Sequence, residues 1–178
     1  MRKLVALAAS AVLLAGASTA QAQLAVGHTD VGVVAGLGNI GNSNIALGGR
    51  FEKVIKPLPD LGGGTLGIMV GVNYYSYSDK FGAIGWSVKY LPIGATANYH
   101  FKVTNKKIDP FLGLGLGYQI INCSYDSPQG SFDYCSNSAL YFIGRAGIRY
   151  FTSDKLALYA DAGAGDATLN VGVMFKMK

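Results

Sequence analysis

One stretch of the sequence decides the fold: Asp109-Pro110-Phe111-Leu112-Gly113-Leu114-Gly115-Leu116-Gly117-Tyr118-Gln119-Ile120. Side chains alternate between the two faces of an extended strand, so the leucines share one face with Tyr118 and Ile120, and the glycines share the other with Gln119. A helix would scatter the leucines around its surface and hold these glycines in its interior, each at a cost of about 1 kcal/mol. The stretch is therefore predicted to be a β-strand with one bulky apolar face and one face almost free of side chains.

The bulky face of this strand has no charged face behind it. A soluble sheet packs its large residues inward and covers the outside with charged residues, whereas the face opposite the leucines carries glycine and one glutamine. We infer that the apolar face is itself the outer surface of the protein and that it faces lipid.

The composition supports a membrane β-protein. The chain has 178 residues, enough for one domain or one small barrel, and only 14% are charged, against about 25% in ordinary soluble domains. Glycine is abundant, with 25 residues, beside 11 tyrosines and 8 phenylalanines. After the N-terminal segment, no apolar run reaches the 18 residues typical of a membrane-spanning helix, which excludes a helical membrane protein.

Residues 1–22 have the features of a secretory signal peptide. Arg2 and Lys3 precede an apolar run over residues 4–17, and Ala20-Gln21-Ala22 fits a cleavage site. Sec export is therefore expected, with residues 23–178 as the mature barrel. The mature chain has 13 basic and 10 acidic residues, and without a basic cluster beyond Lys106-Lys107 it is not expected to bind nucleic acid.

Eight segments of the mature chain alternate in the manner of the first, each about 10 residues long, the length that crosses a bilayer when tilted. They are predicted over residues 30–37, 44–53, 65–77, 86–102, 109–121, 138–151, 156–162 and 169–177. An even number of strands allows an antiparallel up-and-down barrel to close with both chain ends on one side. The predicted fold class is all-β, an eight-stranded antiparallel up-and-down transmembrane β-barrel.

The lengths of the connections and the positions of the aromatic residues fit a barrel that crosses a membrane. Compact turns follow the second, fourth and sixth strands, and a long loop is expected over residues 126–137; a second loop is expected over residues 78–85. Pro92 cannot donate a backbone hydrogen bond, so we expect a β-bulge near Leu91-Pro92. Aromatic residues cluster near the two strand ends, as at membrane interfaces: Phe51, Tyr99, Phe101, Tyr150 and Phe175 at one, and Tyr74, Tyr118 and Phe142 at the other.

Charged residues fall on the small, glycine-rich face of the strands, whereas a soluble lipocalin-like barrel would carry them outside. The predicted lumen network comprises Asp30, Arg50, Glu52, Lys102, Arg145, Arg149, Asp161 and Lys176. An uncompensated buried charge costs about 3–5 kcal/mol, so these groups are expected to pair with one another. The functional alternative is a narrow, anion-leaning pore, although eight strands enclose room for little beyond side chains. The glycines of residues 113–117 are expected to make room for Arg145 and Arg149.

Cys123 and Cys135 are the two cysteines of the chain. In an exported protein such a pair is expected to form a disulfide, worth about 2–3 kcal/mol in the chain-entropy model. No histidine lies near either residue in the sequence, so a metal site is not expected there.

With these strands in place, the chain resembles the small outer-membrane β-barrel family typified by OmpX and the OmpA transmembrane domain, over the whole mature length. Residues 109–118 look like a strand of that family. The C-terminal segment is similar to the signal read by the barrel-assembly machinery, polar-x-Gly-x-x-hydrophobic-x-hydrophobic, in Asn170, Gly172, Phe175 and Met177. It departs in ending with Met177 and Lys178 instead of an aromatic residue. The peptidoglycan-binding role of OmpA is not carried over, because no domain of that type follows the predicted barrel.

Two further features of the sequence, a glycine-rich motif and a histidine, are interpreted as structural. Gly36-Leu37-Gly38-Asn39-Ile40-Gly41 matches G-x-G-x-x-G, but no helix or βαβ unit surrounds it, so nucleotide binding is not expected. His100 is predicted to point into the lumen, and no strand serine pairs with it as in a lipid-modifying hydrolase. Neither an enzyme activity nor a cofactor is therefore expected.

The sequence predicts a monomeric barrel in the outer membrane of a Gram-negative bacterium, in contact with outer-membrane lipid and lipopolysaccharide. Its expected role is structural or surface-interactive: membrane integrity, adhesion or stress response. A narrow channel for small solutes is the alternative, and a lipid-modifying enzyme a third. The expected loops contain several aromatic and aliphatic residues. These belong either to the membrane interface at the loop end of the barrel or to a surface that binds an extracellular partner: Phe81, Ile84, Trp86, Tyr125, Phe132 and Tyr134.

Overall fold

The computed structural model describes residues 24–38, 40, 43, 45–82, 84–127 and 130–177, with the backbone alone at 81, 126, 127 and 131–136. The predicted signal peptide, residues 1–22, lies outside this part and stays a prediction. None of the described residues forms a helix long and apolar enough to cross a membrane.

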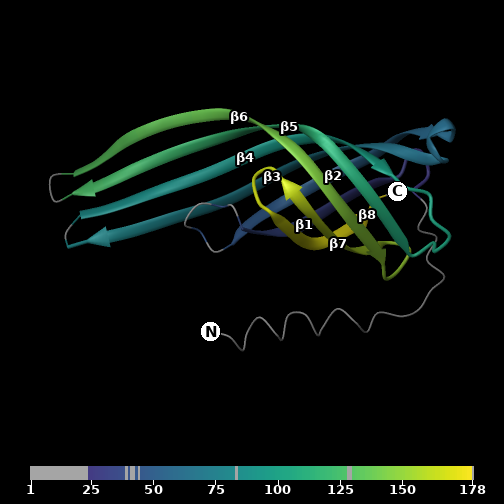
Figure 1. Ribbon diagram of the computed structural model, residues 1–178. Helices are drawn as coiled ribbons and strands as arrows, with labels where there is room; N and C mark the ends of the chain where they lie inside the picture. The colour runs from purple at the N-terminus through teal and green to yellow at the C-terminus, as the bar shows by residue number, and fades with distance from the viewer. Residues whose placement is uncertain are drawn as a thin grey trace.

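The described chain forms a closed barrel of eight antiparallel strands in which each strand pairs with its neighbours in sequence and β1 pairs with β8 (Figure 1). The predicted fold is confirmed. The strands are β1 (Thr29–Leu37), β2 (Ala46–Leu58), β3 (Gly64–Phe81), β4 (Ile84–His100), β5 (Ile108–Ser127), β6 (Gly130–Phe151), β7 (Leu156–Ala164) and β8 (Leu169–Lys176), with a 3-10 turn η1 at Pro59–Leu61.

The bulky face of β5 is the outside of the barrel. Leu112, Leu114, Leu116 and Tyr118 are 49%, 62%, 63% and 46% exposed, whereas Phe111 on the inner face is 2% exposed. The same arrangement holds around the barrel, where large apolar side chains such as Val33 on β1 and Leu47 on β2 are exposed. The prediction that the leucine face lies outside is therefore confirmed.

The barrel has two different ends. One, here called the terminal end, holds the start of β1 and the end of β8, where Asp30 pairs with Lys176, together with the short connections after β2, β4 and β6. At the other end β3, β4, β5 and β6 run on past β1, β2, β7 and β8 (Figure 1). We call this extension the protruding sheet: residues 75–81 of β3, 84–91 of β4, 119–127 of β5 and 130–143 of β6.

The protruding sheet corrects the prediction of two long loops. Residues 78–85 and 126–137 were expected to be loops because they are rich in serine, aspartate, glycine and proline. Most of them are paired strand: Ser78 pairs with Ser87, and Asp126 pairs with Ser131. Pairing with a neighbouring strand has overridden the local composition.

The predicted bulge at Leu91-Pro92 is also wrong. Val72 pairs with Ile93 and Tyr75 pairs with Tyr90, so both strands advance by the same number of residues and the register is kept. The missing N–H of Pro92 interrupts the ladder towards β3 without shifting it. The register shifts lie elsewhere, after Val54 in the β2–β3 pair and after Cys123 in the β5–β6 pair.

The glycines of β5 make room for neighbours other than those expected. A Cβ on Gly113 would lie 2.4 Å from Asn98 Oδ1, and one on Gly117 would lie 2.2 Å from Tyr141 Cζ. Arg145 is the backbone partner of Gly113, but the side chain over Gly113 is that of Asn98. Both side chains belong to direct register partners of these glycines, Asn98 across the β4–β5 pair and Tyr141 across the β5–β6 pair.

Gly115 provides a test of this packing. Its replacement by alanine is expected to lower the free energy of unfolding by about 1–3 kcal/mol, because the new Cβ would lie 1.9 Å from the Ala95 carbonyl oxygen and 2.7 Å from Thr96 Cα. Urea unfolding in phosphatidylcholine vesicles measures the change. The matched control is Gly49→Ala, whose Cβ meets nothing closer than 3.8 Å; equal losses in the two variants would contradict the packing described.

Candidate functional site

The half of the lumen nearer the terminal end is filled by a cluster of charges around Arg149, here called the Arg149 cluster. The Arg149 side chain is fully buried. Its Nη1 lies 2.7 Å from Asp30 Oδ2, its Nη2 contacts Glu52, and its Nε lies 3.9 Å from Asp109 Oδ2. One guanidinium from β6 therefore ties together carboxylates from β1, β2 and β5.

Two histidines complete the Arg149 cluster. His28 Nε2 lies 2.7 Å from Asp30 Oδ1. Both ring nitrogens of His100 are engaged, Nε2 at 3.0 Å from Glu52 Oε1 and Nδ1 at 3.0 Å from Asp109 Oδ2. All of these side chains are buried, so the cluster links strands that are far apart in the sequence through hydrogen bonds within the lumen.

An aromatic wall packs against the Arg149 cluster. The rings of Phe111 and Tyr159 stack with centroids 5.8 Å apart. Arg149 Cζ lies 5.6 Å from the Phe111 ring centroid, within cation–π range. This wall and the ion pairs leave Arg149, Phe111 and Glu52 among the largest fully buried side chains of the described residues.

A second set of charges, the Arg145 cluster, lies toward the protruding sheet. Arg145 pairs with Asp161, donates to the Ala167 carbonyl at 2.9 Å and lies 3.8 Å from Asp166 Oδ1. Asn170 donates to Asp161 at 2.9 Å. Arg50 joins the same region: its Nη1 donates to Asn73 Oδ1 at 2.9 Å, and Asn73 in turn donates to Asp166.

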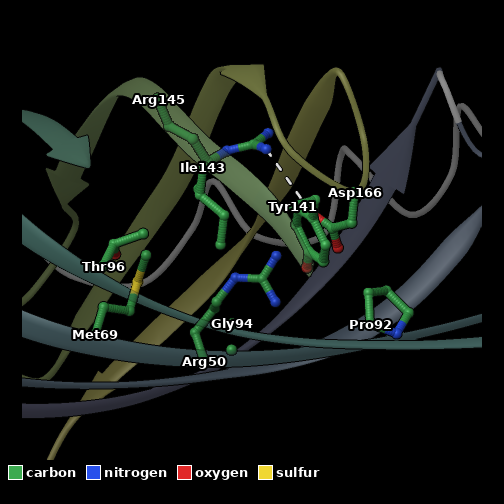
Figure 2. Close-up of a pocket in the computed structure, with 10 residues that line it drawn as sticks. Arg50, Met69, Pro92, Gly94, Thr96, Tyr141, Ile143, Arg145 and Asp166 are labelled. Atoms are coloured by element: carbon green, nitrogen blue, oxygen red, sulfur yellow. Dashed lines mark ion pairs between the residues drawn. The ribbon is translucent and has the colours of Figure 1, made fainter. Parts of the chain in front are cut away.

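Between these side chains a small cavity of about 30 Å³ remains. Figure 2 shows Arg50 and Arg145 on opposite walls of it, with Tyr141 and Asp166 beside them. Such a volume holds one or two water molecules. Together with the Arg149 cluster, it indicates a lumen filled by side chains.

The structure places six of the eight predicted lumen charges inside the barrel: Asp30, Arg50, Glu52, Arg145, Arg149 and Asp161. Lys102 and Lys176 are exposed instead. Lys102 follows the end of β4, where alternation no longer applies, and Lys176 is the last residue of β8, at the barrel rim. The prediction was wrong for both.

Sequence reasoning missed the carboxylates that balance the arginines. Asp109 is in phase with the inward Phe111 and Gly113, so alternation could have found it. Asp166 lies in the connection between β7 and β8, where no periodic pattern exists. The lumen thus holds five carboxylates (Asp30, Glu52, Asp109, Asp161 and Asp166) against three arginines, where an excess of basic groups was expected. Among the described residues, no group of histidine, cysteine and acidic side chains is arranged to hold a metal ion.

The cysteines and the C-terminal signal residues are placed as follows. Cys123 and Cys135 are direct partners in the β5–β6 register, the position a bridge would require; the Cys135 side chain lies outside the described ones, so the disulfide stays a prediction. Of the signal residues, Asn170 is buried and Phe175 and Met177 are exposed, while Gly172 faces β1, where a Cβ would lie 2.1 Å from the Val33 carbonyl oxygen.

In the protruding sheet the polarity of the two faces is reversed. Residues that pair directly across strands share a face. The face continuous with the lumen carries the rows Tyr75–Tyr90–Ile121, Tyr77–Val88–Cys123 and Asp79–Trp86–Tyr125; the face continuous with the outer wall carries Ser76–Lys89–Asn122 and Ser78–Ser87–Ser124. The outer face stays apolar from the barrel wall as far as Leu91, Ile120 and Leu140 at the base of the sheet; beyond these residues the outer face is polar and the inner face is aromatic.

Among the described residues, the aromatic inner face of the protruding sheet packs against other side chains at its base. Tyr75 and Tyr90 stack 4.7 Å apart and pack with Ile40, Ala46 and Ala167. Farther out, Tyr77 and Trp86 meet edge to face at 5.1 Å. Trp86 is 41% exposed and Tyr125 38%, so this part of the aromatic face is open to the surroundings.

Two edges of the protruding sheet, along β3 and β6, have no strand partner among the described residues, although Ser43 Oγ donates to the Ser76 carbonyl oxygen at 2.9 Å. The described part of β2 pairs with β3 no farther than Tyr74, and that of β7 pairs with β6 no farther than Gly144. Residues 75–81 and 130–143 therefore pair on one side alone among the described strands. Unpaired edges of this kind are templates for another strand.

Removing the positive charge of the Arg149 cluster tests its role. Arg149→Met is expected to destabilise the barrel by about 3–5 kcal/mol, because Asp30, Glu52 and Asp109 would be left without their shared cation. The triple variant Arg149→Met/Asp30→Asn/Glu52→Gln should recover part of this loss. Urea unfolding in vesicles measures both, with the exposed-lysine variant Lys89→Met as control; an unchanged midpoint for Arg149→Met would contradict the account.

Comparison with known proteins identifies the fold. No protein-family model and no curated protein matches the chain. Among solved structures, Ail, the attachment invasion locus protein of Yersinia pestis, crystallised with the heparin analogue sucrose octasulfate, aligns with a TM-score of 0.52 at 12% identity, covering 85% of this chain and 96% of that one.

Two further structures align over similar lengths. The N-terminal β-barrel domain of Pseudomonas aeruginosa OprF has a TM-score of 0.49 at 14% identity, over 85% of this chain and 98% of that one. Neisserial surface protein A aligns with a TM-score of 0.47 at 18% identity, covering 84% of this chain and 95% of that one. The closed eight-stranded topology and the alignment with Ail show that this chain has the fold of the small eight-stranded outer-membrane β-barrels.

Proposed function

We propose that this protein is a non-enzymatic outer-membrane protein of a Gram-negative bacterium and that its protruding sheet binds a partner outside the cell. The observation that carries this proposal is the reversal of polarity between barrel and sheet. An apolar outer wall suits lipid, whereas the polar outer face of the sheet suits water. The aromatic inner face then lies above the membrane, where burying it against a partner releases water.

The barrel supports the proposed location. Its outward side chains are apolar on every strand, including Val33 on β1, Val70 on β3 and Leu158 on β7 by alternation, and its interior is polar, as in barrels of this class. Short connections lie at the terminal end and the long hairpins at the other, the usual asymmetry of periplasmic turns and extracellular segments. The terminal end is thus assigned to the periplasm and the protruding sheet to the exterior.

The sheet offers two modes of contact that act together. Tyr77, Trp86 and Tyr125 supply large, partly exposed rings, the residue types enriched at protein interfaces. The open edges of β3 and β6 can add a strand of a partner through main-chain hydrogen bonds, with side chains of the aromatic face supplying specificity.

The charge of the sheet distinguishes it from a site for polyanions. Ail was crystallised in complex with a heparin analogue, sucrose octasulfate, whose sulfate groups call for a cluster of basic side chains. Here the described charges of the sheet are Lys80, Lys89 and Asp79, which favour an apolar contact over a polyanion.

The packed lumen does not favour the alternative role as a channel. Arg149 is completely buried among three carboxylates, and the cavity beside Arg50 and Arg145 measures about 30 Å³. Carboxylates outnumber arginines in the lumen, which opposes an anion-leaning pore. His100 holds carboxylates at both ring nitrogens, so neither nitrogen is available to activate a nucleophile, and its role is that of a link in the Arg149 cluster.

Substitution of the aromatic face tests the proposal. The triple variant Tyr77→Ser/Trp86→Ser/Tyr125→Ser is expected to reduce adherence at least tenfold, since buried aromatic anchors dominate interface energies. Adherence is measured for bacteria displaying the protein against bacteria without it, on immobilised heparin, on matrix glycoproteins and on cultured animal cells.

The matched control changes the opposite face of the same sheet, Ser78→Ala/Ser87→Ala/Lys89→Ala, and should adhere like the unmodified protein. Heat-modifiable migration on a gel shows that each variant is folded. Equal adherence of the aromatic variant and the control, or no surface on which the protein promotes adherence, would contradict the proposal.

A further inference from the structure

We propose that a groove on the outer wall of the barrel, at the terminal end, binds an anionic glycerophospholipid of the periplasmic leaflet. The inference rests on the membrane orientation proposed above. The groove measures about 560 Å³ and is lined by Leu61, Gly62, Tyr99, Phe101 and Lys102. We call it the Lys102 groove.

The apolar wall of the Lys102 groove is built from an aromatic pair and a turn. Tyr99 points outward near the end of β4 and Phe101 follows the strand; their rings meet edge to face with centroids 4.8 Å apart. The Tyr99 hydroxyl donates to the Leu61 carbonyl, which ties the end of β4 to η1. Phe101 and Leu61 remain 40% and 62% exposed, so the groove presents an apolar surface at the terminal end of the barrel.

Lys102 provides the charge at the edge of this apolar surface. Its side chain lies over the glycine turn: a Cβ on Gly63 would come within 3.3 Å of Lys102 Cδ and 3.9 Å of Nζ. No described carboxylate forms an ion pair with it. An apolar wall with an unneutralised ammonium at its rim matches a lipid whose acyl chain lies on Phe101 and Leu61 and whose phosphate contacts Lys102.

Charge around the whole terminal end favours an anionic headgroup over a neutral one. Lysines lie in or next to the strand ends on this side of the barrel: Lys53, Lys56, Lys102, Lys106, Lys107, Lys155 and Lys176. The carboxylates exposed there among the described residues are Asp60 and Asp154, since Asp30, Glu52 and Asp109 are buried in the lumen. These lysines outnumber the exposed carboxylates, and their excess positive charge attracts anionic lipid.

The position of the groove also selects which lipid it meets. The groove residues Leu61 and Lys102 follow β2 and β4 at the terminal end, whereas the protruding sheet extends from the opposite end of the barrel. With the sheet outside the cell, the groove opens on the periplasmic leaflet, so its phosphate ligand is a glycerophospholipid and the lipopolysaccharide of the outer leaflet is out of reach. Aromatic rings beside lysines at headgroup depth are the arrangement expected of such a contact.

Native mass spectrometry of the folded protein in detergent, with added phosphatidylglycerol or phosphatidylcholine, tests the site. The unmodified protein should bind the first phosphatidylglycerol more tightly than phosphatidylcholine. Lys102→Gln should weaken the first phosphatidylglycerol about fivefold, the loss expected for one lysine near an anionic headgroup. Binding of phosphatidylcholine should not change, and Lys89→Gln, an exposed lysine of the protruding sheet, is the matched control.

Equal affinity for the two lipids, or equal losses in Lys102→Gln and Lys89→Gln, would overturn the proposal. A parallel assay with purified cell-wall sacculi covers the other polyanion of the periplasm: Lys102-dependent binding to sacculi without lipid preference would assign the groove to the wall and overturn the lipid assignment. Neither measurement involves the aromatic face, so failure here and failure of the adherence test are separable.

Discussion

Hydrogen bonds between β1 and β8 close the sheet into a barrel, and this closure determines which side of each strand faces outward. In lipid every backbone N–H and C=O needs a partner within the protein, and a sheet meets this demand only when its edges join. Val31 opposite Phe175 and Val33 opposite Val173 make that join. Once the sheet is closed, alternation assigns each residue to lipid or lumen, so the leucines of β5 lie outside and its glycines inside. Where β3 to β6 extend beyond the neighbouring strands, the sheet is no longer closed. There the outer face becomes polar and the inner face aromatic.

Closure with eight strands leaves a lumen that side chains must fill. Buried charges are stable there only when they are paired, and the pairing runs across the barrel: Arg149 on β6 reaches Asp30 on β1 and Glu52 on β2. Glycines supply the space for such long side chains, as Gly71 does beside Arg50. The interior is thus a polar core, and the surfaces left for function are the two ends.

Much of this architecture could be predicted from the sequence because strand alternation is a local property. The outward leucines and the inward Arg145 and Arg149 follow from counting residues by twos. Not every partner could be derived in this way: Asp166 lies in a connection, and alternation does not tell which of the two register partners of Gly113, Asn98 or Arg145, places its side chain over that glycine. The protruding sheet was missed because Ser78 and Asp126 belong to polar segments that resemble loops, and their pairing depends on neighbours distant in the chain.

We propose that the bulky face of β5 lies in hydrocarbon while the sheet beyond it lies in water. Trp86 is the single tryptophan of the chain, which permits a direct measurement with lipids brominated in mid-chain. In the variant Leu114→Trp/Trp86→Phe, folded in such vesicles, we expect strong quenching of the fluorescence, whereas Trp86 in the unmodified protein should be quenched by aqueous acrylamide and little by the bromines. Quenching of the tryptophan at position 114 by acrylamide and not by the brominated lipid would contradict the account.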